Sequence, residues 1–164
     1  MSTKILISPE LQSVLDRHNI TRYAPAYGGE SVGLDLYYTG TEPIRWYELD
    51  GYEVRKPIQR LRLIPTGLKI ALDNDKVGLL LERGSISKTS LVKRAGVIDP
   101  GYTGEIFVNL VNLGGSGTLM PGDKLPVQLV VVPCDRYFDS VTPEEFAAIT
   151  STAQRSEGKV GSSN

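Results

Sequence analysis

The chain has 164 residues, 40% of them apolar, and a formal net charge of −1 at pH 7. This length suits one domain with its own core, and the near-zero charge gives no global electrostatic basis for binding nucleic acid or an anionic membrane. The single cysteine, Cys134, and the single histidine, His18, exclude an intrachain disulfide and leave almost no raw material for a zinc site or a Ser-His-Asp triad.

The chain starts with MSTKILISPE, which lacks the long apolar core of a signal peptide. No apolar run elsewhere is long enough to span a bilayer. We therefore expect a cytoplasmic protein that has neither a membrane nor a nucleic acid as a partner.

Short apolar runs bounded by Gly, Pro, Asn and Asp recur along the chain and indicate strands. The runs are KILI (4–7), GLDLYY (33–38), RLRLIP (60–65), GLKIAL (67–72), KVGLLLE (76–82), GVID (96–99), EIFVNLVNL (105–113) and KLPVQLVVVP (124–133). The stretches between them, such as LDND, NLGGSG and MPGD, carry the residues of tight turns.

Helical signals are few. Ser8 followed by Pro9 predicts a short helix over SPELQSVLDRH, and Thr142 followed by Pro and two Glu predicts another over TPEEFAAI. The stretch SISKTSL is compatible with one short turn or helix. Many short strands with little helix predict an all-β fold, an antiparallel barrel or jelly roll.

Two segments differ in composition from the rest. Residues 39–60 are polar and aromatic, and we interpret them as an extended hairpin or surface excursion that Trp46 packs down. Residues 151–164 have too little apolar content to fold alone, so we expect a flexible C-terminal arm after a domain formed by residues 1–150.

Five stretches carry polar residues that suit chemistry. Asp35 interrupts an apolar strand, and Arg83, Gly84 and Ser85 directly follow another, where a guanidinium, a hydroxyl and backbone N–H groups would suit phosphate. The stretch GVIDPGYTGE (96–105), which we interpret as a tight hairpin between two apolar strands, contains Asp99 and Tyr102. Gln128 lies within a strand, and the arm ends in RSEGKVGSSN. Each stretch alone also has an ordinary structural explanation.

Their order along the chain resembles the homotrimeric dUTPase family, which has five short motifs in this sequence order. YGGESVGLDL is similar to the first motif, ERGSISKTSL to the second, GVIDPGYTGEI to the third, GDKLPVQL to the fourth and RSEGKVGSSN to the fifth. The third match is the most specific. The resemblance spans residues 4–164, with 39–60 as an insertion.

The resemblance implies hydrolysis of dUTP to dUMP and pyrophosphate with Mg²⁺ on the triphosphate. It also implies a homotrimer of distorted jelly-roll subunits (the dUTPase-like β-clip), in which the arm of one subunit closes over the active site of another. Asp99 would activate the water, Arg155 of the arm would offset charge on the leaving group, and Asp35 would act near the metal through water. The substrate-binding residues would be Arg83, Gly84, Ser85, Gly96, Ile98, Tyr102, Asn109, Gln128, Val160, Gly161 and Ser162.

Tyr102 would pack under deoxyribose and leave no room for a 2′-hydroxyl group. Main-chain groups of the 96–105 turn would read uracil, whose O4 acceptor and N3–H donor are both reversed in cytosine, so that a wrong base leaves buried polar groups unpaired.

Three motifs depart from the family pattern. The order Arg83-Gly84-Ser85 moves the usual serine by one position. Gln128 stands six residues after Gly122 instead of five, which predicts a β-bulge, and Lys124 replaces the usual arginine. The usual aromatic residue of the fifth motif is Val160, which predicts a looser closure over uracil.

Two alternatives remain open. A dCTP deaminase shares the fold and often the turn, but its deamination requires a glutamate where this chain has Asn109, and an amide is no acid or base. A non-catalytic trimeric jelly-roll binding protein is the other alternative, because three motifs depart from the pattern.

Overall fold

The computed structural model describes residues 3–27, 30–49, 55–57, 61, 63–135 and 137–151. The chain divides into two compact units, Met1–Cys134 and Asp135–Asn164.

Thirteen strands and two α-helices make up the described part of the chain. They are β1 (Lys4–Ile7), α1 (Pro9–Arg17), β2 (Leu34–Tyr37), β3 (Ile44–Arg45), β4 (Tyr47–Leu49), β5 (Arg55–Pro57), β6 (Ile64–Pro65), β7 (Leu68–Ala71), β8 (Lys76–Glu82), β9 (Leu91–Arg94), β10 (Val97–Ile98), β11 (Phe107–Asn112), β12 (Thr118–Leu119), β13 (Lys124–Pro133) and α2 (Pro143–Thr150). A 3₁₀ helix, Gly84–Lys88, connects β8 to β9.

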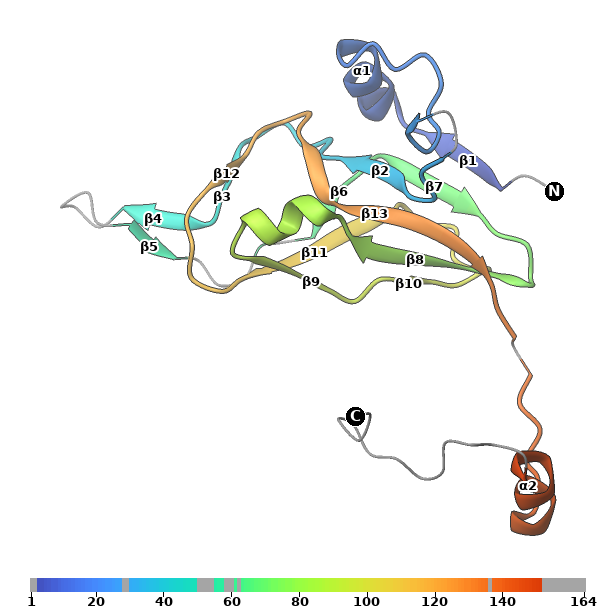
Figure 1. The fold of residues 1–164 in the computed structure, drawn as a ribbon. Coiled ribbons are helices and arrows are strands. Elements are labelled where there is room, and N and C mark those ends of the chain that lie inside the picture. Colours follow the sequence, from blue (N-terminus) through green and yellow to red (C-terminus); the bar gives the residue numbers. More distant parts are fainter. Residues whose placement is uncertain are drawn as a thin grey trace. The chain divides into compact units, whose positions relative to one another are not determined.

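The first unit is built from small antiparallel sheets, as an all-β jelly-roll-like fold requires. The largest has the order β10-β8-β13-β2, and Figure 1 shows β8 and β13 lying side by side along this unit. A second sheet has the order β6-β11-β9, and β1–β7, β3–β12 and β4–β5 form two-stranded pairs. The expected all-β fold class is confirmed.

The strands bury alternate residues because successive side chains point to opposite faces of a sheet. In β11, Val108, Leu110 and Asn112 point inward, and in β13 Leu125 and Val127 do the same. The helix α1 adds an apolar face of Leu11, Val14 and Leu15 to this core, at the spacing that a helix requires. The opposite faces of the strands are therefore free to carry polar side chains.

Both expected helices are present with the expected caps. The Leu11 amide donates to Ser8 Oγ at 3.2 Å, with Pro9 at the first helical position. In the second unit, Thr142 and Glu145 form a reciprocal capping box at the start of α2. No helix among the described residues is long and apolar enough to span a membrane.

Within residues 39–60, the described strands β4 and β5 pair antiparallel. Trp46 packs against the core, and its side chain fills the space beside Gly117, where an added Cβ would lie 2.1 Å from the ring. The buried Asn112 donates to Trp46 O at 3.1 Å, so a polar core residue anchors the base of the insertion.

Candidate functional site

Three charged side chains form an ion-pair group, here called the Asp35 cluster. Asp35 Oδ1 lies 2.8 Å from Arg83 Nε, and Asp35 Oδ2 lies 2.8 Å from Lys124 Nζ. The exposed fractions of the side chains are 17% for Asp35, 27% for Arg83 and 40% for Lys124. One carboxylate thus holds two partly exposed cations, an arrangement that presents net positive charge to solvent.

The alternation of β13 explains why these groups meet. Gln128 lies opposite Asp35 of β2 on one side and opposite Leu81 of β8 on the other. Between Lys124, opposite Tyr37, and Gln128, opposite Asp35, four steps along β13 face two steps along β2, so the register shifts by two residues where the sequence predicted a bulge of one. Lys124 and Gln128 lie on the polar face because they are an even number of residues apart, and the register shift brings Lys124 within reach of the Asp35 carboxylate.

Two side chains that contact Asp35, Lys124 and Tyr23, have shifted pKa values. The hydrogen bond to Asp35 raises the pKa of Lys124 above its usual range, while partial burial opposes this shift. The Tyr23 hydroxyl donates to the main-chain oxygen of Asp35, and burial raises the pKa of Tyr23 well above its usual range. Tyr23 therefore remains a neutral hydrogen-bond donor that holds β2 at the position of the carboxylate.

Gly84 and Ser85 begin the 3₁₀ helix directly after Arg83, and both are exposed. The Arg83 amide donates to Pro126 O at 2.9 Å, which ties the start of this helix to β13. An added Cβ on Gly84 would meet no atom within 4 Å, so folding does not demand glycine at this position.

A second set of expected residues lines a cavity of about 280 Å³, here called the Asp99 pocket. Gly96, Ile98, Asp99, Tyr102 and Asn109 all contribute to its lining. The lining is completed by Leu63, Leu80, Arg94, Ala95, Val97, Ile106 and Phe107. Asp99 directly follows β10, is exposed and belongs to the lining of this mostly apolar cavity.

The turn that carries Asp99 is rigid for identifiable reasons. Gly96 has a φ of +135°, and its carbonyl accepts from the Leu80 amide at 2.7 Å. An added Cβ on Gly96 would lie 2.9 Å from Leu80 Cβ, so only glycine fits. The Tyr102 amide donates to Asp99 O at 3.0 Å across Pro100, which closes the turn.

The Tyr102 ring is held beside this turn. Its hydroxyl donates to Glu105 O at 2.6 Å, although 42% of the residue is exposed. Glu105 is fixed in turn, because its Oε1 accepts from the amides of Thr66 and Gly67 at 3.0 and 2.8 Å. A flat ring with a fixed orientation is thus available at the wall of the Asp99 pocket.

The segment 96–105 is not a hairpin, so the expectation from its sequence is wrong. β10 pairs with β8, whereas β11 pairs with β6 and β9, so the segment connects two different sheets. After the turn that the Tyr102 amide closes, the buried Ile106 donates its amide to Leu68 O at 2.8 Å, which directs the chain to β11 in the other sheet.

Within one chain, the Asp99 pocket lies far from the Asp35 cluster. Ile98 pairs with Gly78 near the start of β8, while Arg83 follows the last residue of β8. At about 3.3 Å per residue, the five residues from Gly78 to Arg83 cover roughly 17 Å, and Asp99 continues β10 further away from Arg83. The Asp99 pocket and the Asp35 cluster therefore lie near opposite ends of β8.

The described residues offer no ready-made cage for a metal ion, since no three His, Cys, Asp or Glu side chains among them converge. Asp35 is the only carboxylate of its cluster, and each of its oxygens contacts a cation. The Asp35 oxygens therefore suit Mg²⁺ only if phosphate oxygens of a ligand coordinate the ion and Asp35 contacts it through a water molecule.

The expected residues of the arm, Arg155, Val160, Gly161 and Ser162, lie outside the described residues. Conversely, the sequence did not predict three side chains that take part in these groups: Lys124, Tyr23 and Glu105. Lys124 was visible as a departure from the fourth motif, but nothing in the sequence signals the contacts of Tyr23 or Glu105, which join residues distant along the chain.

A family model described as dUTPase matches residues 50–164. The deoxyuridine 5'-triphosphate nucleotidohydrolase of Clostridium kluyveri is 31% identical over 156 residues, which cover 93% of this chain and 97% of the relative. The Pol polyprotein of equine infectious anemia virus is 31% identical over 111 residues, which cover 67% of this chain but only 9% of the polyprotein.

Solved structures share the fold. The dUTPase of Staphylococcus bacteriophage 80alpha with dUPNHPP gives a TM-score of 0.68 at 21% identity, covering 99% of this chain and 98% of that chain. A mutant dUTPase from phage phi11 of S. aureus, described with a structural Mg(II) ion, gives a TM-score of 0.63 at 20% identity, covering 87% and 97%.

Proposed function

The chain belongs to the dUTPase family, and from this membership we propose that it hydrolyses dUTP to dUMP and pyrophosphate. The observation that carries the proposal is the Asp99 pocket, whose lining combines an exposed carboxylate, a fixed tyrosine ring and an amide side chain. A base, a flat surface for a sugar and a polar reader for a pyrimidine are what this reaction needs.

In the proposed reaction, the Asp99 carboxylate accepts a proton from a water molecule that attacks the α-phosphorus. The bond between the α-phosphate and the bridging oxygen breaks, and pyrophosphate leaves with that oxygen. A base on a rigid turn next to a strand is held in line better than one on a loose loop tip, because hydrogen bonds fix its backbone.

Tyr102 packs under the deoxyribose ring in this proposal and excludes a 2′-hydroxyl group by contact. Gly96 and Ile98 offer main-chain groups to the uracil edge, and Asn109 contributes its amide. Support comes from the lining of one cavity by all four residues.

Arg83, Gly84, Ser85 and Gln128 bind the phosphate oxygens in this proposal. Arginine suits this role because its guanidinium donates in a fork that matches two oxygens. The Asp35–Arg83 ion pair orients the guanidinium before the nucleotide arrives, and Lys124 adds a second positive charge on the same face.

A structural Mg(II) ion is described for a phage dUTPase of the same fold, and we propose Mg²⁺ for this protein as well. The phosphates of the substrate would hold the ion, and Asp35 would contact it through water. When bound, Mg²⁺ offsets negative charge on the triphosphate. The residues of this chain orient the nucleotide and take up the proton.

We further propose that the active protein is a homotrimer with shared active sites. The support is the separation of the Asp99 pocket from the Asp35 cluster by about the length of β8, roughly 17 Å from the strand geometry. Asp99 acts at the α-phosphorus in this proposal while Arg83 contacts the same triphosphate, and we infer that the two groups come from different copies. Closed symmetric rings of identical subunits provide such contacts.

The C-terminal arm completes the site in this proposal: Arg155 offsets charge on the leaving pyrophosphate, and Val160, Gly161 and Ser162 cover the nucleotide. The support is the resemblance of RSEGKVGSSN to the fifth family motif. We place this activity in the cytoplasm, in line with the sequence expectation.

Product analysis tests the proposed function against its closest rival. With Mg²⁺ and dUTP, we expect pyrophosphate and dUMP in equal amounts, and with dCTP we expect no ammonia, because Asn109 cannot act as an acid or a base. Ammonia release from dCTP would favour a deaminase, and the absence of both products would favour a binding protein.

A further inference from the structure

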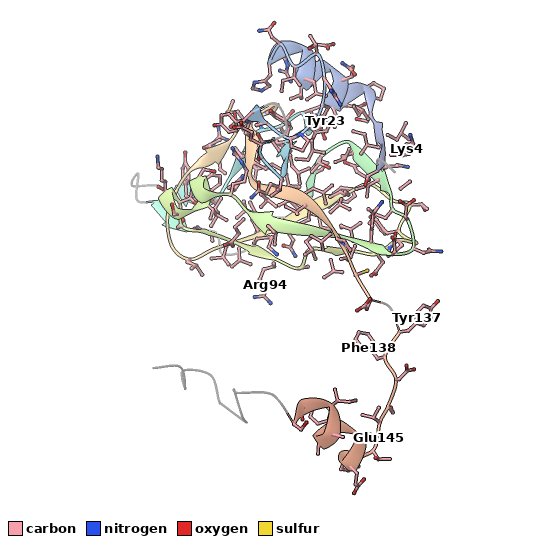
Figure 2. The ribbon with its side chains drawn as sticks, turned by 45° about the vertical axis from the view of Figure 1, so that its right-hand side comes forward. Lys4, Tyr23, Arg94, Tyr137, Phe138 and Glu145 are labelled. Carbon is pink, nitrogen blue, oxygen red and sulfur yellow. The ribbon has the colours of Figure 1, made fainter. Side chains whose placement is uncertain are left out.

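Arg94 lines the Asp99 pocket together with Asn109, to which we assign contact with the base. It is the last residue of β9 and pairs directly with Asn109 of β11. Directly opposed residues of an antiparallel pair have Cβ atoms about 4.5–5.5 Å apart and side chains on the same face. Arg94 and Asn109 both belong to the lining of the pocket. Arg94 is exposed, and Figure 2 shows its side chain projecting outward from the ribbon.

The Arg94 guanidinium makes no hydrogen bond or ion pair with any of the described residues. Its neighbour differs in this respect, since Lys93 Nζ donates to Ala95 O at 2.6 Å. Arg94 is also the only cationic side chain in the lining of this pocket as described. The five N–H donors of the Arg94 guanidinium are therefore free to bind a ligand.

An asparagine alone does not distinguish uracil from cytosine. Its amide carries both a donor and an acceptor, so a turn of the side chain matches either the N3–H and O4 of uracil or the N3 and amino group of cytosine. A guanidinium has donors only. Placed beside the amide, it matches the O4 acceptor of uracil, whereas the cytosine amino group would meet it donor to donor.

We propose that Arg94 is a specificity-determining residue, which donates a hydrogen bond to O4 of the uracil base while Asn109 accepts from N3–H. This inference deepens the proposed dUTP hydrolysis and rests on it. Arg94 supplements the main-chain reading of the base by adding a side chain that rejects the cytosine amino group.

Calorimetric binding of dUMP and dCMP tests this role without requiring turnover. Arg94→Gln keeps a long polar side chain but introduces an acceptor, and Arg94→Lys keeps a donor-only cation. Arg45→Gln on β3 is the matched control, because Arg45 is exposed and outside the pocket lining. Far-UV circular dichroism and thermal unfolding establish that each variant is folded.

We expect Arg94→Gln to weaken dUMP binding about tenfold and to reduce the preference for dUMP over dCMP by about tenfold or more. Arg94→Lys should keep most of the preference, and Arg45→Gln should match the wild type. An unchanged preference in folded Arg94→Gln, or an equal loss in Arg94→Lys, would overturn the inference. A wild type that prefers dUMP but does not cleave dUTP would contradict the proposed hydrolysis and leave the role of Arg94 intact.

Discussion

Asp35 and Arg83 form an ion pair of 2.8 Å although β13 lies between their strands in the sheet. Asp35 belongs to β2 and Arg83 follows β8, so the pair joins the two neighbours of β13. Lys124 of β13 contacts the second carboxylate oxygen at 2.8 Å. The cluster thus connects three strands on the polar face of the largest sheet.

Asp35→Ala should lower the free energy of unfolding by about 1–3 kcal/mol, because it leaves two partly buried cations next to each other without an anion. Lys124→Ala should cost less than about 1 kcal/mol, since the Lys124 side chain is 40% exposed and its pairing is screened by water. Urea unfolding measures both. The matched control is Asp73→Ala, which breaks the exposed Asp73–Lys76 pair and should change stability little. Equal values for Asp35→Ala and Asp73→Ala would contradict the stabilising role of the cluster.

Stability should fall at alkaline pH in part through Lys124. Its folded-state pKa is raised above the usual 10.5, so its contribution is fully present below that pH and is lost as pH rises through the higher folded-state value. Lys124→Arg keeps a cation that does not titrate in this range. We therefore expect Lys124→Arg to lose less unfolding free energy than the wild type above about pH 10.5.

The pKa of the buried Tyr23 is also raised in the folded state, so its ionisation likewise lowers the unfolding free energy at alkaline pH. The wild type and Lys124→Arg both retain Tyr23. The difference between the two pH profiles therefore isolates Lys124. Parallel profiles in urea unfolding experiments would show that the hydrogen bond to Asp35 does not stabilise the folded state.

Long apolar strands were predictable from the sequence. KVGLLLE and KLPVQLVVVP coincide with β8 and β13, because apolar runs of this length bounded by turn residues are typical of buried strands. β9 was not predicted, since LVKR has only two apolar residues and becomes a strand by pairing with β11. Whether such a short segment forms a strand depends on pairing with residues that are distant in the sequence.

The residue types of the site were predictable from five motifs, but their grouping was not. The Asp35–Lys124 contact joins residues 89 positions apart, and it depends on a bulge in β13. The pairing of β10 with β8 instead of β11 separates Asp99 from Arg83. Such relations follow from tertiary pairing, which is not encoded in the local pattern.

Gly96→Ala should destabilise the protein by about 2–3 kcal/mol, because the backbone φ of +135° strains any Cβ and the new atom would lie 2.9 Å from Leu80 Cβ. Gly101→Ala in the same turn is the control, since no atom lies within 4 Å of its added Cβ and its φ is not in the left-handed region. Thermal and urea unfolding of the two variants measure the difference. Similar stabilities would show that the turn yields to accommodate a side chain.

Mixed oligomers test whether two copies share one active site. Arg83→Gln and Asp99→Asn should each be inactive alone, but refolding them together at equal concentration should restore about a quarter of wild-type activity. The reason is that random mixing in a closed ring brings an intact Asp99 and an intact Arg83 together in one site of four. No recovery in mixed oligomers verified by mass spectrometry would mean that both residues act within the same chain.

The most direct measurement is pyrophosphate release from dUTP with Mg²⁺ by the wild type and by Asp99→Asn. The side chains have nearly the same shape, so the variant should fold and bind nucleotide, yet an amide cannot take the proton from the attacking water. We expect turnover to fall by about 100-fold or more with little change in dUMP binding. Turnover by Asp99→Asn at the wild-type rate, or a folded wild type that leaves dUTP intact, would contradict the proposed role of the Asp99 carboxylate.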